Sequence, residues 1–458
     1  MKYMHLRKNP MKNSKLALTL FLFLGAGLSG CPPLESPQAD FRANHTQGAA
    51  PLEVRFTDLS IPGKSPITEW FWMFGDGVTS TEQDPTHTYT AEGNFTVSLT
   101  VTTDQGEDTR LAFNFITVST GGEGEEEGEF PVGEMISVPA GTFTMGRTDA
   151  GDDALLGQAD ELPRHSVTLS AYEIGKYDVT TQEYVEFLNW ALGQGLLENE
   201  LGMPYAGGIV FIDNEIIFSI FSGEAVEAGI VFGGETFSSA ARIGMPGFTS
   251  YSMKLHPVIN VSWYGAVHYC NWLSEQKGLT PCYDTETWTL NRSANGYHLP
   301  TEAQWEHAAA WDAVSEKHWI YGFMSDTNLG RERCNIREFL GWSGCVNPLG
   351  FLTEPYTSPV GWFNGINISP NGNIQTVDSP SPVGCYDMSG NVWQWCNDWY
   401  GLYISDPVSD PEGPDAGTQR VIRGGSWFYN DNSARSAQRS QIAPYATYFN
   451  FGFRLARF

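Results

Sequence analysis

The chain has 458 residues, enough for two or three domains that each bury a hydrophobic core. Hydrophobic residues make up 41% of it and charged residues 17%, as in ordinary globular proteins. The formal net charge is -27, from 53 acidic and 26 basic side chains, so the surface repels phosphate backbones. The composition therefore argues against nucleic acid as a partner.

Residues 1–30 are typical of an export signal. Lys12 and Lys15 precede the apolar run LALTLFLFLGAGLSG, which is shorter than the ~20 residues of a membrane span and ends at Cys31. The residues before Cys31 resemble a bacterial lipobox, which implies a diacylglycerol on this cysteine; a secretory signal with a chance cysteine is the alternative. We expect an exported lipoprotein of the cell envelope that its lipid holds to a membrane. Pro32 replaces the aspartate that retains some lipoproteins in the inner membrane, which favours the outer membrane or the cell surface.

Behind a polar tether at residues 31–38, residues 39–119 predict a small antiparallel β-sandwich, because apolar and polar residues alternate between Gly, Pro and Asp turns. The segment WMFGDG from Trp72 carries an Asp-Gly hairpin signal. Together with HTYTAEGNFTVSLTV from His87, it resembles the polycystic-kidney-disease (PKD) domain. The resemblance implies a spacer domain with Trp72 and Phe74 in its core; a weak protein-binding or glycan-binding face is the alternative.

Residues 120–133 are predicted to be a linker. Glycine alternates with glutamate there, and nothing apolar appears before Phe130. Such a segment cannot bury enough surface to fold and repels itself, so we expect it to be extended. It separates the sandwich from the large remainder, residues 134–458.

The remainder is rich in Gly, Asn and Asp loops and shows three helical patterns. The first is TTQEYVEFLNWAL, with Thr180 or Thr181 as its N-cap. The second begins at Ser262 and stops at Gly278, and the third, PTEAQWEHAAAW, has a capping box that begins at Thr301.

Six segments of this remainder follow the order of a known family: ISVPAGTFTMG, YEIGKYDVTTQEY, HPVINVSWYGAVHYCNWLS, YHLPTEAQWEHAA, DMSGNVWQWCNDWY, and RVIRGGSW with the closing GFR. They resemble the sulfatase-modifying factor family, whose best-known members are the formylglycine-generating enzymes. The resemblance implies an α+β fold with little regular secondary structure, related to C-type lectins. The predicted fold class is therefore multidomain, with a small all-β, Ig-like sandwich followed by this α+β domain.

Formylglycine-generating enzymes are copper-dependent oxidases that convert a sulfatase cysteine to formylglycine. The resemblance implies that two cysteines between the GGS motif and the closing RS pair bind the copper, since thiolates hold Cu(I). Here that segment is WFYNDNSARSAQ, residues 427–438, and it contains no cysteine. Tyr429 lies at about the first position, and Asp431 or Ala434 at about the second. We therefore expect neither a copper site nor the oxidase activity.

Without that chemistry, the domain is predicted to be a recognition module. We expect it to bind a peptide or a glycan in a lectin-like cleft, because it is rich in aromatic and amide side chains. Arg435, Arg439 and Arg454 are expected to pair with core carboxylates. The alternative is a family oxidase that acts on a protein cysteine or a small thiol through other metal ligands. The candidate cleft residues, all in or after the RGGSW motif, are Ser426, Trp427, Tyr429, Asp431 and Arg435.

The resemblance also implies calcium. In the family, oxygens around a GNxWEW loop form one site, which corresponds here to Asp387, Gly390, Val392 and Gln394, with Gln in place of Glu. A second site would begin at Asn335 and Ile336, although its downstream acid cannot be placed. The alternative is that GNVWQW is a buried tryptophan turn without metal.

Six cysteines follow Cys31, and an even number favours disulfides outside the cytoplasm. Their spacing suggests three local bridges, but other connectivities remain open. The three couples are Cys270 with Cys282, Cys334 with Cys345, and Cys385 with Cys396.

Overall fold

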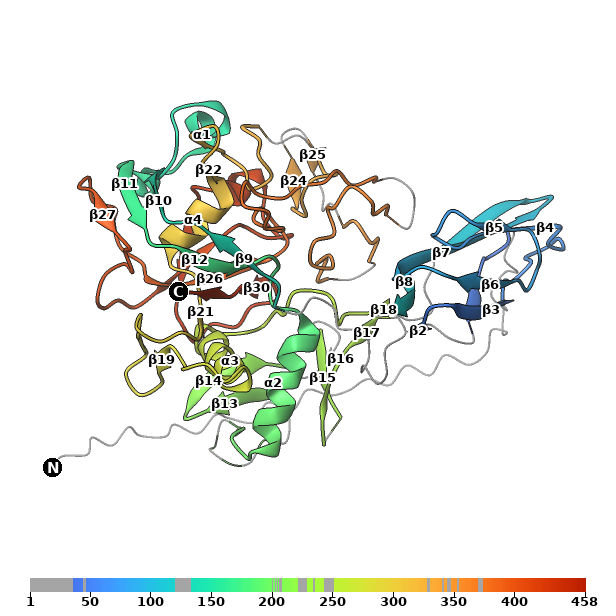
Figure 1. The fold of residues 1–458 in the computed structure, drawn as a ribbon, viewed down its shortest axis with the longest axis horizontal. Coiled ribbons are helices and arrows are strands. Elements are labelled where there is room, and N and C mark those ends of the chain that lie inside the picture. The colour runs from blue at the N-terminus through green and yellow to red at the C-terminus, as the bar shows by residue number, and fades with distance from the viewer. Residues whose placement is uncertain are drawn as a thin grey trace, which may run out of the picture.

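The computed structural model describes residues 36–43, 47–119, 133–199, 201, 203, 205, 208–220, 229–233, 235–242, 251–327, 330–339, 342–343, 347–351, 354–369 and 374–458. The predicted export signal, Cys31, most of the linker and Cys345 lie outside the described residues. Figure 1 shows the blue and cyan strands as one domain and the green-to-red remainder as a second, as the sequence predicts. No helix among the described residues is long and apolar enough to cross a membrane.

The first domain is a sandwich of two sheets, with strand orders β1-β3-β6 and β2-β8-β7-β4-β5. Its pairings are antiparallel except that of β2 with β8. Trp72 and Phe74 are buried in its core, as expected, and Trp72 packs on Phe41 and Phe56. The strands are β1 (Phe41–Ala43), β2 (Gln47–Ala49), β3 (Leu52–Asp58), β4 (Glu69–Met73), β5 (Thr79–Ser80), β6 (Thr86–Tyr89), β7 (Gly93–Thr103) and β8 (Gly106–Ser119).

The WMFGDG hairpin joins β4 to β5, but its loop is longer than a two-residue Asp-Gly turn. The loop spans residues 74–78 and is closed by a hydrogen bond from Phe74 N to Val78 O at 3.1 Å. Gly75 has a φ of 88°, and a Cβ on it would lie 2.5 Å from Thr96 O. The first glycine of the motif is therefore required by its close approach to β7 as well as by its own backbone conformation.

The second domain contains the three predicted helices. The structure adds a short one, α1, which the sequence does not predict because six residues are too few to show a helical period. The helices are α1 (Gly151–Leu156), α2 (Thr181–Gly193), α3 (Trp263–Gln276) and α4 (Glu302–Ala310), with 3-10 turns at Ala159–Glu161 and Asp431–Ala434.

Side-chain caps begin the predicted helices. Thr180, rather than Thr181, caps α2: its Oγ1 accepts a hydrogen bond from Glu183 N, and the Glu183 carboxylate accepts one from Thr180 N. Thr301 begins a reciprocal box of the same kind on α4, and Ser262 caps α3. The local capping signals in the sequence are thus confirmed.

Short strands and loops make up the rest of the second domain, which confirms the predicted fold class. Two four-stranded sheets, β21-β31-β12-β9 and β29-β28-β26-β30, and the three-stranded sheet β10-β11-β27 form its frame. The last strand, β31, lies between β21 and β12, in the same sheet as β9 at the start of the domain. The strands are β9 (Met135–Val138), β10 (Gly141–Met145), β11 (His165–Leu169), β12 (Tyr172–Gly175), β13 (Ile209–Ile212), β14 (Glu215–Ser219), β15 (Ile230–Phe232), β16 (Phe237–Ser239), β17 (Ala241–Arg242), β18 (Tyr251–Ser252), β19 (Tyr283–Asp284), β20 (Thr289–Leu290), β21 (Tyr297–His298), β22 (Trp311–Asp312), β23 (Lys317–His318), β24 (Glu338–Phe339), β25 (Trp342–Ser343), β26 (Trp393–Trp399), β27 (Val408–Ser409), β28 (Arg420–Arg423), β29 (Arg439–Ile442), β30 (Phe451–Gly452) and β31 (Ala456–Arg457).

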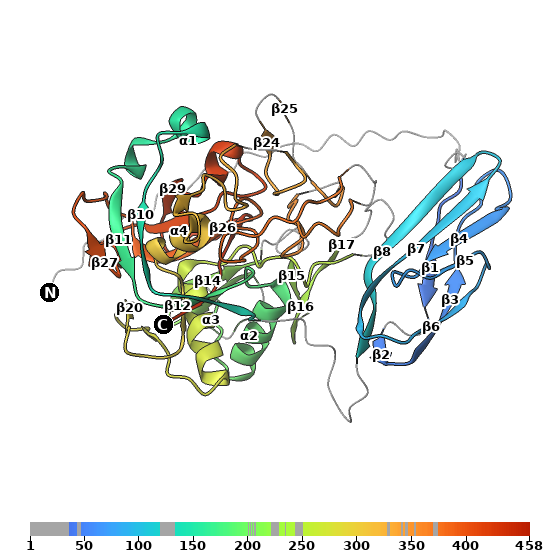
Figure 2. The same ribbon diagram turned by 45° about the horizontal axis from the view of Figure 1, so that its top comes forward.

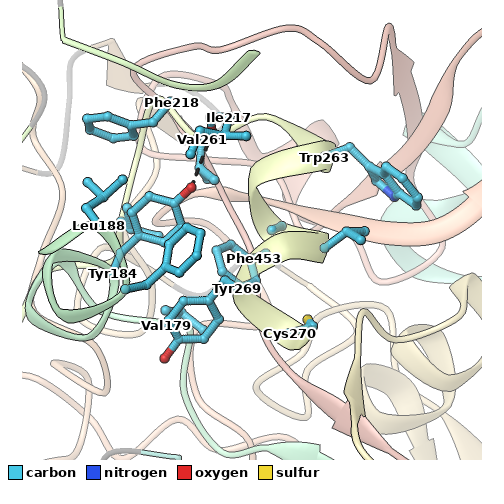
Figure 3. Close-up of a cluster of buried hydrophobic side chains, with 14 of the residues drawn as sticks. Val179, Tyr184, Leu188, Ile217, Phe218, Val261, Trp263, Tyr269, Cys270 and Phe453 are labelled. Atoms are coloured by element: carbon cyan, nitrogen blue, oxygen red, sulfur yellow. Dashed lines mark hydrogen bonds between the residues drawn. The ribbon is translucent and has the colours of Figure 1, made fainter. Parts of the chain in front are cut away.

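The main core lies between α2, α3 and the segment around β30. Figure 2 shows α2 and α3 side by side, and Figure 3 shows the aromatic side chains packed between them. Tyr184 of α2 packs on Tyr269 of α3 and on Phe453, and its hydroxyl donates to Ile217 O at 3.3 Å. α4 packs separately against β10, β11, β26 and β28. This second contact places α4 beneath the RGGSW segment.

Candidate functional site

Buried ion pairs connect the RGGSW segment to α4. The Arg423 guanidinium donates to Glu302 Oε1 and Glu306 Oε2, both at 2.6 Å, and Arg439 holds both oxygens of Glu302. Burial raises the pKa of the Glu306 carboxyl, but the charge of Arg423 and the other contacts outweigh it and lower that pKa to about 2. These charges fix α4 against β28 and β29.

The expected pairing of arginines with core carboxylates is confirmed. Arg435 donates to Asp153 Oδ1 at 2.7 Å and to Glu161 Oε1 at 2.6 Å. Arg454 lies 3.2 Å from Asp178 Oδ1. All of these side chains are fully buried, so they position loops and do not contact a ligand.

Gln394 binds protein groups in the GNVWQW loop and does not fit the predicted calcium site. Its amide oxygen accepts from Trp305 Nε1 at 2.7 Å and from Arg454 Nε at 2.6 Å, and its amide nitrogen donates to Asp387 O at 2.8 Å. Both lone pairs of that oxygen are used, and a guanidinium lies where a cation would have to bind. Asp387 Oδ2 accepts from Gly361 N at 2.6 Å, and burial raises the pKa of this carboxyl to about 6.

The second predicted calcium site does contain a suitable oxygen. Asn335 is 1% exposed, and its Oδ1 has no hydrogen-bond partner among the residues that the structure describes, while its Nδ2 donates to Tyr356 O at 2.7 Å. A hard cation would satisfy such an orphaned oxygen. Ile336 and Val392 are buried, and a Cβ on Gly390 would collide with Asn335 O. No three Asp, Glu, His or Cys side chains converge among the described residues, so backbone oxygens would have to complete the site, which stays a prediction.

The cysteines that the structure describes are free, so none of the predicted disulfides is formed in it and the bridges stay a prediction. A bridge needs Cβ atoms ~3.5–4.5 Å apart, and spacing along the chain does not set that distance. Burial raises the pKa of each thiol, that of Cys282 and that of Cys385 to about 11. The thiol form therefore predominates in these cysteines at neutral pH, and the thiolate is the reactive form. The free, buried cysteines are Cys270, Cys282, Cys334, Cys385 and Cys396.

The predicted cleft is not open at most of its candidate residues. Gly424 and Gly425 have φ values of 93° and 72°, and the side chains that follow them point into the core. Trp427, for example, packs on Tyr356 and Phe449. Ser426, Trp427 and Arg435 have no exposed surface and Asp431 is 5% exposed, whereas Tyr429 is 44% exposed.

Exposed and half-buried rings do gather around Tyr429. We define the aromatic surface as Phe428, Tyr429 and Phe449, together with Tyr448, which precedes Phe449 in the chain and packs on Phe451. The Phe428 ring lies 5.3 Å from that of Phe449 and 5.7 Å from that of Tyr429. Tyr429 also packs edge-on against Trp393, at 5.8 Å. Tyr448 is 46% exposed, so this surface presents phenol rings to solvent.

Arg337 adds a charge to the aromatic surface. Its guanidinium lies 4.7 Å from the centre of the Phe428 ring, and its backbone nitrogen donates to Tyr429 O at 2.8 Å. Arg337 and Tyr448 were not among the predicted cleft residues, because both lie outside the segment between the RGGSW motif and residue 438. The aromatic-rich run PYATYFNF before the closing GFR was the available signal.

The fold and the site define a two-domain protein, in which a β-sandwich precedes an α+β domain whose last third is fixed by buried arginines. A family model described as the sulfatase-modifying factor enzyme 1-like domain matches residues 122–458, and a PKD domain model matches residues 34–118. The chain therefore belongs to the sulfatase-modifying factor family and carries a PKD domain before the family domain.

Named relatives differ in how much of their length is matched. The chain is 30% identical over 332 residues to the formylglycine-generating enzyme of Thermomonospora curvata. The matched region covers 70% of this chain and 92% of that enzyme. It is 27% identical over 330 residues to the serine/threonine-protein kinase pkn1 of Chlamydia pneumoniae, but spans only 38% of that kinase. Among solved structures, Treponema denticola variable protein 1 matches 70% of this chain and 94% of its own length, at 24% identity and a TM-score of 0.41.

Proposed function

We propose that this chain is an exported lipoprotein of the cell envelope whose family domain recognises a peptide or a glycan and does not oxidise cysteine. The observation that carries the proposal is the state of its thiols. No cysteine follows Cys396, and the described cysteines are buried with raised thiol pKa values. Copper chemistry of the family type needs two thiolates in residues 427–438, where Tyr429 and Asp431 or Ala434 stand instead.

Recognition is supported by the aromatic surface. Tyr429 and Tyr448 expose rings that are amphipathic, with an apolar face and a hydroxyl that can donate or accept. The buried Arg423 and Arg435 ion pairs flank the loop that carries Tyr429, and a hydrogen bond from Asn260 N to Tyr448 O holds the other loop, so little ordering is needed when a ligand binds.

The N-terminal parts of the chain would position the family domain relative to the membrane. In this proposal Cys31 carries the lipid, and the PKD domain and the Gly/Glu-rich linker hold the binding domain away from the membrane. The outer membrane or the cell surface is the proposed location. Replacing Cys31 with alanine should move the protein from the membrane fraction to the soluble fraction of fractionated cells, and unchanged membrane association would contradict the anchor.

A family oxidase that acts on a protein cysteine or a small thiol is the second candidate. It is favoured by the 30% identity to a formylglycine-generating enzyme over 92% of that relative. It would need copper ligands other than a thiolate pair, or a different oxidant.

The two candidates are separated by metal analysis and a peptide assay on the purified full chain. We expect no more copper than in a control protein and no conversion of the cysteine in a CxPxR peptide to formylglycine. Stoichiometric Cu(I) binding, or the mass change of formylglycine formation, would favour the oxidase. Binding to a peptide or glycan array that is lost in Tyr429→Ala would support recognition.

A further inference from the structure

We propose that the aromatic surface and Arg337 together bind an acidic oligosaccharide. A sugar ring stacks on the exposed phenol rings, and its carboxylate pairs with the Arg337 guanidinium. This rests on the proposed recognition function and names its ligand class.

The charge of Arg337 is the first support. Arg337 is exposed, and the structure shows no ion pair between it and a described carboxylate side chain. By contrast, Arg423 and Arg439 share Glu302 in the core. A guanidinium that is exposed to solvent beside an aromatic ring is available to an external carboxylate, which it can hold through two parallel hydrogen bonds.

The second support is the fixed position of that charge. Arg337 N donates to Tyr429 O at 2.8 Å, and Tyr429 N donates to Ser426 O at 3.0 Å. Tyr448 O accepts from Asn260 N at 3.0 Å, which ties the other exposed ring to the core. The cation and the rings are therefore held by backbone hydrogen bonds, and a rigid ligand that spans them can match both at once.

The shape of the site favours a sugar over a peptide. Tyr429 and Tyr448 are 44% and 46% exposed, so they offer ring faces and hydroxyl groups. A sugar ring has an apolar face and polar edges that suit such rings. An acidic peptide has no such ring, so it would use only the charge of Arg337.

The test measures binding of three probes to the full chain by titration calorimetry. The probes are a xylo-oligosaccharide with one glucuronate branch, the same oligosaccharide without the branch, and an end-blocked Ala/Glu peptide. We expect the uronate probe to bind about tenfold tighter than the neutral one, as a charge-assisted pair implies. Arg337→Gln should remove that difference, and Tyr429→Ala should weaken both sugars. Arg42→Gln, which removes an exposed arginine of the PKD domain, is the matched control and should change neither.

Three outcomes would overturn the inference. Equal binding of the two sugars, or no effect of Arg337→Gln, would remove the role of the charge while leaving recognition intact. Tighter binding of the peptide than of the uronate sugar would identify an acidic peptide as the ligand. Absence of binding to all probes would overturn the ligand class, whereas formylglycine formation or Cu(I) binding would overturn the proposed recognition function itself.

Discussion

At Arg423 a guanidinium is enclosed by two carboxylates from successive turns of α4. Glu302 and Glu306 accept its hydrogen bonds, and none of the three side chains is more than 5% exposed. Removal of one partner leaves a buried charge unpaired, so we expect Arg423→Met to lower the free energy of unfolding by about 3–5 kcal/mol. Chemical denaturation would measure the loss.

Arg457→Met provides the comparison, because the pair of Arg457 with Glu173 is partly open to solvent. We expect it to lower the free energy of unfolding by less than about 1 kcal/mol. Similar losses in the two variants would show that burial does not determine how much these ion pairs contribute to the free energy of unfolding.

Asp398 should make stability depend on pH. It is buried and accepts a hydrogen bond from Glu302 N at 2.8 Å; burial and the charge of Glu302 raise its pKa from 3.8 to about 8. Between these values the folded state keeps a proton that the unfolded chain loses, so the free energy of unfolding falls as pH rises. Asp398→Asn keeps an acceptor and removes the titration. The melting temperature of this variant should therefore fall less than that of the unchanged protein from about pH 6 to about pH 9.

Asp410→Asn is the control for this pH effect. Hydrogen bonds from Ser170 and the charge of Arg292 lower the pKa of Asp410 despite partial burial, so its stabilising charge is complete above its unfolded pKa and is lost only in acid. The slope of its melting temperature from about pH 6 to about pH 9 should equal that of the unchanged protein. If the melting temperature of Asp410→Asn depended less on pH than that of Asp398→Asn, the assignment of the pH effect to Asp398 would be contradicted.

Single residues were predictable where their role is local. The sequence predicted that Arg435 pairs with a buried carboxylate. It did not indicate that the partners are Asp153 and Glu161, which lie 282 and 274 residues away along the chain. It also assigned Gln394 to calcium, because the nearby Arg454 guanidinium that uses its oxygen is not visible in the GNVWQW motif.

Among the elements, α2 allows a matched test of capping. Thr180 and Thr181 are adjacent and nearly buried, but only Thr180 forms the capping box, whereas the Thr181 hydroxyl has no hydrogen-bond partner. Thr180→Val should lower the free energy of unfolding by about 1 kcal/mol. Thr181→Val keeps the shape of the side chain and removes an unsatisfied group, so it should be neutral or slightly stabilising. Thermal unfolding of both variants would check this, and equal losses would contradict the role of the cap.

Helices were predicted better than strands because the hydrophobic period and the capping residues of a helix all lie within or next to its own segment. Periodicity and caps located α2, α3 and α4, whereas most strands of the second domain have only two to five residues. In β21 (Tyr297–His298) or β31 (Ala456–Arg457) no alternation can be read, and only their pairing with each other, far apart in the sequence, defines them.

For the whole molecule, calcium binding remains to be measured, and the prediction now rests on Asn335. Addition of calcium to protein that has been freed of metal by a chelator should raise its melting temperature. At a calcium concentration 100-fold above the dissociation constant, the free energy of unfolding should rise by ~2.7 kcal/mol. Asn335→Ala should abolish this shift and Asp387→Asn should not. The reverse pattern would place the ion at the GNVWQW loop, and no shift in the unchanged protein would exclude both predicted sites.

The sequence by itself determined the domain order, the family, the capped helices and the absence of cysteine from residues 427–438, because each can be read from a contiguous stretch of residues. Only the tertiary structure decided which of the conspicuous residues face solvent. Trp427 and Arg435 are buried and Tyr429 is exposed, although all three belong to one short segment. Side-chain direction there depends on two glycines in positive φ and on carboxylates from the start of the domain, and no local pattern contains that information.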